Sequence, residues 1–95
     1  MEDLREWAPG KWRSTGRANA LVIGRDLRWS WESSAGGRWS GSGRGEIEDG
    51  GRLLLLRGWH STSIPMTLRL TREGEALVGE LQTSRSYRII FIREP

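Results

Sequence analysis

The chain has 95 residues, the size of one domain, and its hydrophobic fraction of 36% allows only a compact core. It has no cysteine and a single histidine, which excludes a disulfide scaffold and argues against a zinc site made of protein ligands. We therefore expect no metal and no cofactor. Fourteen of the 15 basic residues are arginines, spread along the chain among 12 carboxylates, and the net charge is +3. Because a nucleic-acid-binding domain usually gathers its positive charge on one face, a nucleic-acid partner is not expected.

Membrane-spanning and targeting segments are not expected either. No apolar run is longer than four residues, the length of Leu53–Leu56, which is far shorter than a helix that crosses a bilayer. The N-terminal stretch Met1–Arg5 is acidic and lacks the apolar segment of a secretory signal. These features predict a cytoplasmic protein without a membrane span.

Alternation of apolar and polar residues with a period of two predicts a chain made of short strands. In chain order, eight strands are expected at residues 11–16, 19–24, 27–33, 42–48, 52–58, 63–70, 76–82 and 86–93. A short helical turn is expected before them, within residues 2–7. The clearest alternation places Leu27, Trp29 and Trp31 on one face of the third strand. The leucine run in the fifth strand leaves its inward face ambiguous, and the last strand is apolar on both faces.

Glycines dominate one face of the fourth predicted strand. Gly41, Gly43 and Gly45 share the face of Ile47, which we expect to point inward beside the two tryptophans of the third strand. The missing side chains leave space beside the indoles. The rings can fill that space, because glycines permit the coiling that a small barrel needs, or a ligand can share it.

The expected turns favour a closed barrel. Tight hairpins are predicted at 24–26, 48–51 and 72–75, and Asp49-Gly50 suits the positive φ angles of a type I′ turn. No stretch has room for the crossover helix that parallel strands require. Closure removes exposed strand edges, and eight strands enclose a space that side chains fill or that holds one small ligand. We predict a single all-β domain, residues 1–95, folded as an eight-stranded antiparallel up-and-down (meander) barrel with a short N-terminal helical turn.

Two motifs lie in the first and last strands of this predicted barrel. Gly10-Lys11-Trp12 opens the first strand after the helical lead, and Arg93 closes the last strand. This arrangement resembles the calycin superfamily, lipocalins in particular, in which a Gly-x-Trp packs across the barrel floor against an arginine of the last strand. The resemblance implies a lipocalin-like floor made by Gly10, Trp12 and Arg93. In an eight-strand meander the first strand begins where the last one ends, so a cation–π contact of about 1 kcal/mol can form there.

The opposite end, the mouth, is expected to carry the longer loops, at 16–18, 34–41, 58–63 and 83–86. Binding residues concentrate on loops held by a rigid scaffold. The candidate ligand-binding residues are the aromatic and basic residues of the mouth together with inward residues of the barrel. They are Trp29, Trp31, Arg38, Trp39, Trp59, His60, Met66 and Arg85.

An apolar interior with arginines at its mouth suits a hydrophobic or amphipathic molecule that carries a carboxylate or phosphate. The leading hypothesis is therefore a small-molecule binding barrel. A small barrel enzyme, such as a cyclase or isomerase acting on an apolar substrate, is an alternative. No spacing around His60 selects a catalytic triad, and we read this residue as an exposed loop histidine. An interaction module without a cavity is another alternative, and a homodimer stays open. Arginines interleaved with tryptophans could also form a stacking platform for single-stranded nucleic acid. The alternation argues against it, because it points Trp29 and Trp31 inward.

Overall fold

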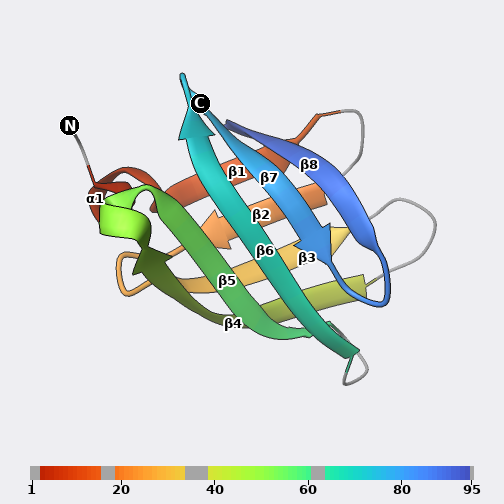
Figure 1. Ribbon diagram of the computed structural model, residues 1–95. Helices are drawn as coiled ribbons and strands as arrows, with labels where there is room; N and C mark the ends of the chain where they lie inside the picture. Colours follow the sequence, from red (N-terminus) through yellow and green to blue (C-terminus); the bar gives the residue numbers. More distant parts are fainter. Residues whose placement is uncertain (1–2, 16–18, 34–38, 61–63, 95) are drawn as a thin grey trace.

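The computed structural model describes residues 3–15, 19–33, 39–60 and 64–94, without the side chains of Trp39 and His60. Eight strands form a closed antiparallel barrel in meander order (Figure 1), which confirms the predicted fold class. The elements are α1 (Leu4–Trp7), β1 (Gly10–Ser14), β2 (Asn19–Ile23), β3 (Arg28–Ser33), β4 (Trp39–Glu48), the 3₁₀ turn η1 (Asp49–Gly51), β5 (Leu53–His60), β6 (Ile64–Glu73), β7 (Ala76–Gln82) and β8 (Ser86–Arg93). No helix of the described residues is long and apolar enough to cross a bilayer.

The hairpin turns contain the positive φ angles that their residues predict. Asp49 and Gly50 have φ angles of 53° and 65°, so both adopt the positive φ that the Asp-Gly turn predicts. Gly74, in the turn between β6 and β7, also has a positive φ, of 63°. After the first hairpin turn, the buried side chain of Leu27 points into the core although its φ is 65°. These turns carry the chain from one strand to its neighbour without a crossover.

The alternation of β3 is confirmed. Trp29 and Trp31 point into the barrel, where Gly43 and Gly41 face them across the β3–β4 pair. A Cβ atom added to Gly43 would lie 2.0 Å from the carbonyl oxygen of Arg57, so only glycine fits at this close approach of β4 to β5. The indole Nε1 of Trp29 lies 3.3 Å from the same carbonyl oxygen. The ring of Trp29 therefore fills the space that the glycines leave.

Strand β5, whose inward face is ambiguous in the sequence, also has a defined orientation. Leu54 and Leu56 of β5 belong to the barrel core, whereas Leu55 points outward. Leu55 is nevertheless only 2% exposed, between Glu46 of β4 and Arg69 of β6 in the strand register. The aliphatic parts of such long charged side chains can cover an apolar neighbour. Leu55 can therefore point outward and still be buried, which the alternation alone could not show.

The barrel closes where β1 pairs with β8. Trp12 and Arg93 are register partners across this seam. The guanidinium carbon of Arg93 lies 4.2 Å from the ring centroid of Trp12, which confirms the predicted contact. Gly10 has a φ of 143°, and a Cβ there would lie 2.6 Å from Nη1 of Arg93. Gly10 therefore leaves the room that the guanidinium occupies.

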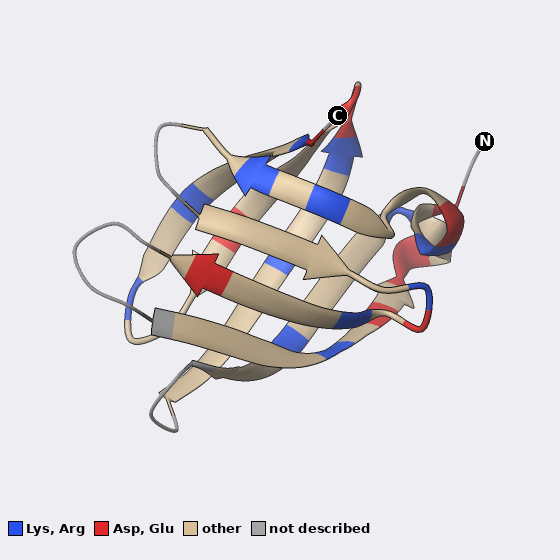
Figure 2. Cartoon of the chain, turned by 180° about the vertical axis from the view of Figure 1, so that it is seen from behind, with Lys and Arg blue, Asp and Glu red and all other residues tan. Residues whose placement is uncertain are grey.

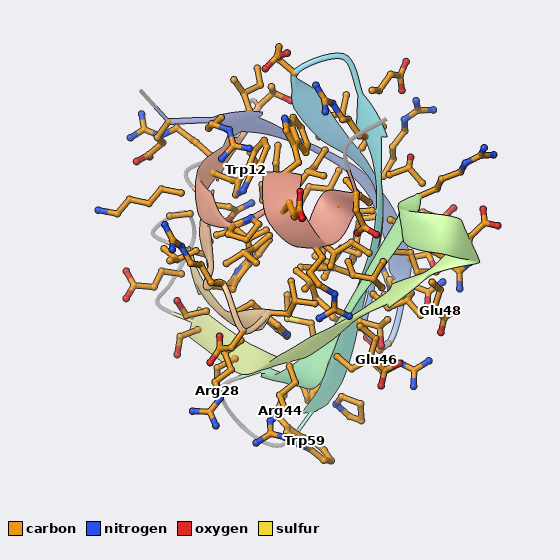
Figure 3. The ribbon with its side chains drawn as sticks, turned by 90° about the vertical axis from the view of Figure 1, so that its left-hand side faces the viewer. Trp12, Arg28, Arg44, Glu46, Glu48 and Trp59 are labelled. Carbon is orange, nitrogen blue, oxygen red and sulfur yellow. The ribbon has the colours of Figure 1, made fainter. Side chains whose placement is uncertain are left out.

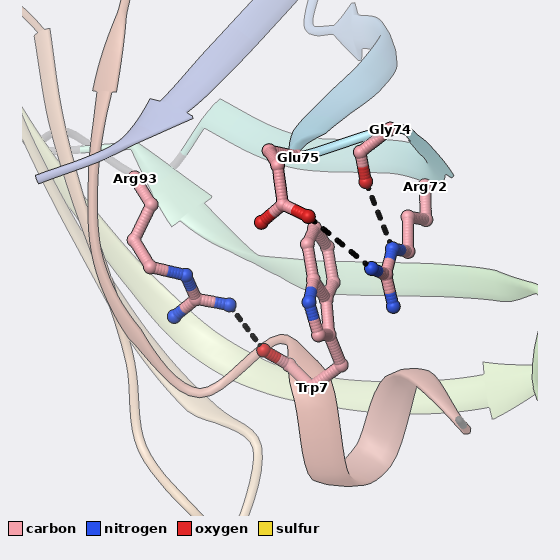
Figure 4. A network of polar contacts seen from close by, with 5 residues as sticks. All are labelled: Trp7, Arg72, Gly74, Glu75 and Arg93. Carbon is pink, nitrogen blue, oxygen red and sulfur yellow. Dashed lines mark hydrogen bonds and ion pairs between the residues drawn. The ribbon is translucent and has the colours of Figure 1, made fainter.

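Helix α1 covers the floor of the barrel with Trp7, a residue that the sequence analysis did not single out. Its indole lies between two guanidinium groups, at 4.0 Å from Arg72 and 5.0 Å from Arg93 (Figure 4). Arg93 also donates hydrogen bonds to the carbonyl oxygens of Trp7 and Pro9. The indole of Trp12 donates to the carbonyl oxygen of Ala8 at 2.8 Å. The helix and the ends of β1, β6 and β8 are thereby tied into one closed floor.

Candidate functional site

A cavity of about 930 Å³ lies at the mouth, the end of the barrel opposite α1. Its described lining comes from the mouth-facing ends of β1, β2 and β3, from the start of β6 and from the hairpin that joins β7 to β8. These strands are far apart in sequence and meet here because the barrel is closed (Figure 1). The cavity is therefore a consequence of the fold and not of a single motif.

Three small polar residues form one side of the cavity. Ser14 ends β1, Asn19 begins β2 and Ser33 ends β3, and all three are buried inward positions of their strands. Asn19 and Ser33 are also register partners. Each strand thus changes from apolar to polar on its inward face within the last residues before the mouth. This side offers hydroxyl and amide groups that both donate and accept hydrogen bonds.

The rest of the lining mixes apolar residues with Thr83, Ser84 and Ser86 of the β7–β8 hairpin. Trp31 forms its inner wall, with its ring packed edge-to-face against Phe91 at a centroid distance of 5.7 Å. Leu81 of β7 and Ile89 of β8 continue this wall, and Ile64 contributes from β6. A ligand with an apolar body and a polar end would find matching surfaces in this lining.

Only one of the predicted ligand-binding residues lies in this described lining: Trp31. Trp29 and Met66 are buried deeper in the core; the Met66 sulfur lies 3.1 Å from where a Cβ on Gly41 would be. Arg85 lies exposed in the β7–β8 turn, beside lining residues but outside the lining itself. Arg38 and the side chains of Trp39 and His60 lie outside the described residues.

Two of the predicted mouth loops, 34–41 and 58–63, had wrong boundaries, whereas the loop at 83–86 is confirmed within one residue. Strand β4 begins at Trp39 and β5 continues to His60, so Trp39, Trp59 and His60 belong to strands and not to loops. The β-ladder continues because His60 still pairs with Gly41 and Ile64. Trp59 consequently points away from the barrel interior, with 60% of its surface exposed. It does not line the cavity.

Sequence reasoning missed the polar side of the cavity. Ser14 lies two residues after Trp12, Ser33 lies two residues after Trp31, and Asn19 lies two residues before Leu21. Extending the inward alternation by one step would have found all three. The contribution of β8, including Tyr87 and Arg88, has no comparable pattern in the sequence.

The electrostatics of the described lining are simple. Arg88 is its one charged residue, and none of its described residues is a carboxylate or a histidine. Among the described residues, no group of three or more His, Cys, Asp or Glu side chains could hold a metal ion. The arrangement can bind a molecule by apolar contact and hydrogen bonding and can attract an anion. Within the described lining there is no paired acid and base for proton transfer.

Comparison with known proteins gives no relative. No family model, no curated protein and no solved structure matches the chain. The geometry of the cavity and of the surface therefore carries the functional argument.

Proposed function

We propose that this chain is a small-molecule binding barrel that takes an amphipathic ligand through its mouth. The observation that carries the proposal is the cavity of about 930 Å³, whose lining combines apolar residues with small polar ones. Its volume falls in the range of roughly 300–1,000 Å³ that is typical of ligand pockets. A molecule with an apolar body would lie against Trp31 and Leu81 and direct a polar end towards Ser14, Asn19 and Ser33.

The polar side supports a ligand with hydrogen-bonding groups. Burying hydroxyl and amide groups against a purely apolar molecule is unfavourable, because their hydrogen bonds to water are lost. A ligand oxygen or nitrogen would replace those bonds at Asn19 and Ser33. Arg88 adds a guanidinium at the edge of the cavity, which favours a carboxylate or a phosphate on the ligand. We infer an anionic amphiphile as the preferred class.

Binding is preferred over catalysis because of what the described lining contains. An isomerase or cyclase acting on an apolar substrate generally needs a group that donates or removes a proton. Tyr87 and Arg88 are the titratable residues of the described lining, and the carboxylate opposite Arg88 in the register, Glu80, lies outside that lining. The walls suit retention of a molecule more than its conversion.

We also propose that the barrel is related to the calycins. Support comes from the floor, where Gly10, Trp12 and Arg93 make the contacts that the resemblance implies. The helical lead before Gly10 covers that end, and the opposite end holds the cavity. A floor closed by an indole and a guanidinium, with an open mouth, supports binding of small molecules from one side only.

The proposal is tested by filling the cavity. Ser33→Phe places a ring on the inward face of β3 at the mouth, whereas Ser30→Phe places the same ring on the outer face of the same strand. We expect a medium-chain fatty acid to quench or shift the tryptophan fluorescence of the wild type and of Ser30→Phe, with the response lost in Ser33→Phe. An equal response in all three proteins, or no response to any amphiphile in the wild type, would overturn the proposal.

A further inference from the structure

Three arginines form a row across the outer surface of the barrel. Arg28 of β3 pairs with Arg44 of β4, and Arg44 pairs in turn with Arg57 of β5. All three are exposed on the outer face. Directly opposite residues of neighbouring antiparallel strands have Cβ atoms about 4.5–5.5 Å apart, so the three side chains start within about 10 Å of one another. In the sequence these arginines are widely separated, and only the strand register brings them together.

The charge of this row is poorly compensated. Arg28 lies 3.5 Å from the carboxylate of Asp26, but no ion pair among the described residues involves Arg44 or Arg57. Like charges directly opposite one another across a strand pair are unfavourable. A bound anion would remove that repulsion. The row therefore favours an anionic partner.

An exposed indole lies next to the row. Trp59 follows Arg57 by two residues on the outer face of β5, and its register partners are Ser42 and Pro65. Figure 3 shows Arg28, Arg44 and Trp59 on the same side of the barrel, pointing away from it. Glu46 and Glu48 lie farther along β4, towards the floor, and bound the basic region on that side. The outer face of β3, β4 and β5 thus brings an exposed indole next to guanidinium groups from three strands.

We propose that this outer face of β3, β4 and β5 binds single-stranded nucleic acid. The guanidinium groups of Arg28, Arg44 and Arg57 would hold consecutive phosphates, since the arginine fork matches phosphate oxygens with two hydrogen bonds. The indole of Trp59 would stack on an unpaired base beside those phosphates. Bases inside a duplex are stacked on one another, so this surface selects single strands.

The shape of the surface favours a linear polymer over a lipid membrane. The outside of a barrel is convex, and a planar array of headgroups would meet only the crest of the row. A flexible strand can follow the row from β3 to β5 and keep a base on Trp59. On the neighbouring strands β6, β7 and β8, Glu80 lies between Arg69 and Arg88 in the register, whereas the row has an arginine on each of its three strands. Basic residues also occur on other strands of the barrel (Figure 2).

The site is separate from the mouth cavity. Arg28, Arg44, Arg57 and Trp59 lie on the outer face, and none of them belongs to the described cavity lining. Nucleic-acid binding is therefore a further activity that does not depend on the proposed ligand. The expectation from the sequence, that a chain with dispersed arginines does not bind nucleic acid, did not take the register into account.

The test measures the fluorescence anisotropy of a labelled oligothymidylate of about twelve nucleotides, within the span of known single-strand sites, over a range of salt concentrations. The wild type is expected to bind with a clear salt dependence. Arg44→Ser combined with Arg57→Ser should make the negative slope of log K against log salt shallower by about 1.4, the value for two lost phosphate contacts on a single strand. Trp59→Leu, which keeps the charge, should raise the Kd about tenfold through loss of one stacked base.

A matched control changes the same charge elsewhere. Arg5→Ser combined with Arg52→Ser removes two exposed arginines at the floor and should leave the slope and the Kd nearly unchanged. Ser33→Phe should also bind the oligonucleotide normally, which separates this site from the cavity. Equal weakening by the control pair, equal affinity for a duplex of the same length, or binding of anionic vesicles but not of the oligonucleotide would each overturn the proposal.

Discussion

Gly43 and Gly58 face each other across β4 and β5 at a distance that excludes a side chain on either residue. A Cβ on Gly58 would lie 1.9 Å from the carbonyl oxygen of Ser42, and one on Gly43 would lie 2.0 Å from that of Arg57. The Trp29 ring packs beside this point, with Nε1 directed at the Arg44 and Arg57 carbonyl oxygens. Paired glycines here allow the two long strands to coil tightly enough to close the barrel.

Gly58→Ala should therefore destabilise the protein by about 2–4 kcal/mol, because its Cβ overlaps backbone that cannot move independently. Urea unfolding followed by circular dichroism measures the change. Ser42→Ala, on the exposed outer face of β4, is the control and should change stability by less than about 0.5 kcal/mol. A Gly58→Ala protein as stable as this control would mean that β4 and β5 do not approach so closely.

Trp12→Ala should cost about 3–5 kcal/mol, the usual range for deleting a large buried aromatic side chain. Trp12 is 0% exposed and contacts α1, β8 and the Arg93 guanidinium, whereas Trp59 is 60% exposed. Trp59→Ala is thus a matched control, with an expected loss below about 0.5 kcal/mol. Chemical denaturation of both variants gives the comparison. A loss below about 1 kcal/mol for Trp12→Ala would contradict its role in closing the floor.

Arg93→Lys keeps the charge and removes the planar fork. The guanidinium contacts two indoles and two carbonyl oxygens, and a lysine ammonium cannot make all four contacts at once. We expect a loss of about 1–3 kcal/mol in thermal or urea unfolding. Arg88→Lys, on an exposed position of the same strand, should be neutral. Equal stability of the two variants would show that charge alone suffices at position 93.

The sequence predicted the fold well because each strand satisfies a local rule. Trp29 and Trp31 alternate with polar residues, Asp49-Gly50 fits its turn, and meander topology alone brings Trp12 and Arg93 to the same end. Local alternation does not define where a strand stops, which is why Trp59 was assigned to a loop. Its outward direction follows from the continuation of β5 to His60.

The candidate site was predicted less well, for two physical reasons. A cavity depends on how much space side chains from several strands leave, and alternation gives direction but not volume. Small polar residues such as Ser14 and Asn19 also carry no distinctive signature in a sequence. The arginine row is subject to the same limit, since Arg28, Arg44 and Arg57 become neighbours only once the register of β3, β4 and β5 is known.

Arg88→Gln should weaken binding of a fatty acid several-fold and leave the corresponding fatty alcohol unaffected, because only the carboxylate gains from the guanidinium. Titration of tryptophan fluorescence with both ligands gives the ratio of the two affinities. Arg69→Gln, on the exposed face of β6 and outside the described cavity lining, is the control. An equal loss for acid and alcohol would assign Arg88 a packing role in place of an electrostatic one.

The seam between β1 and β8 also bears on how the protein folds. Every other strand pairing joins neighbours in the sequence and can form as a local hairpin, whereas this one joins residues about 80 positions apart, such as Trp12 and Arg93. The entropic cost of closing so long a loop is recovered only when the seam contacts form. We therefore expect the seam to close late in folding, after the local hairpins have formed.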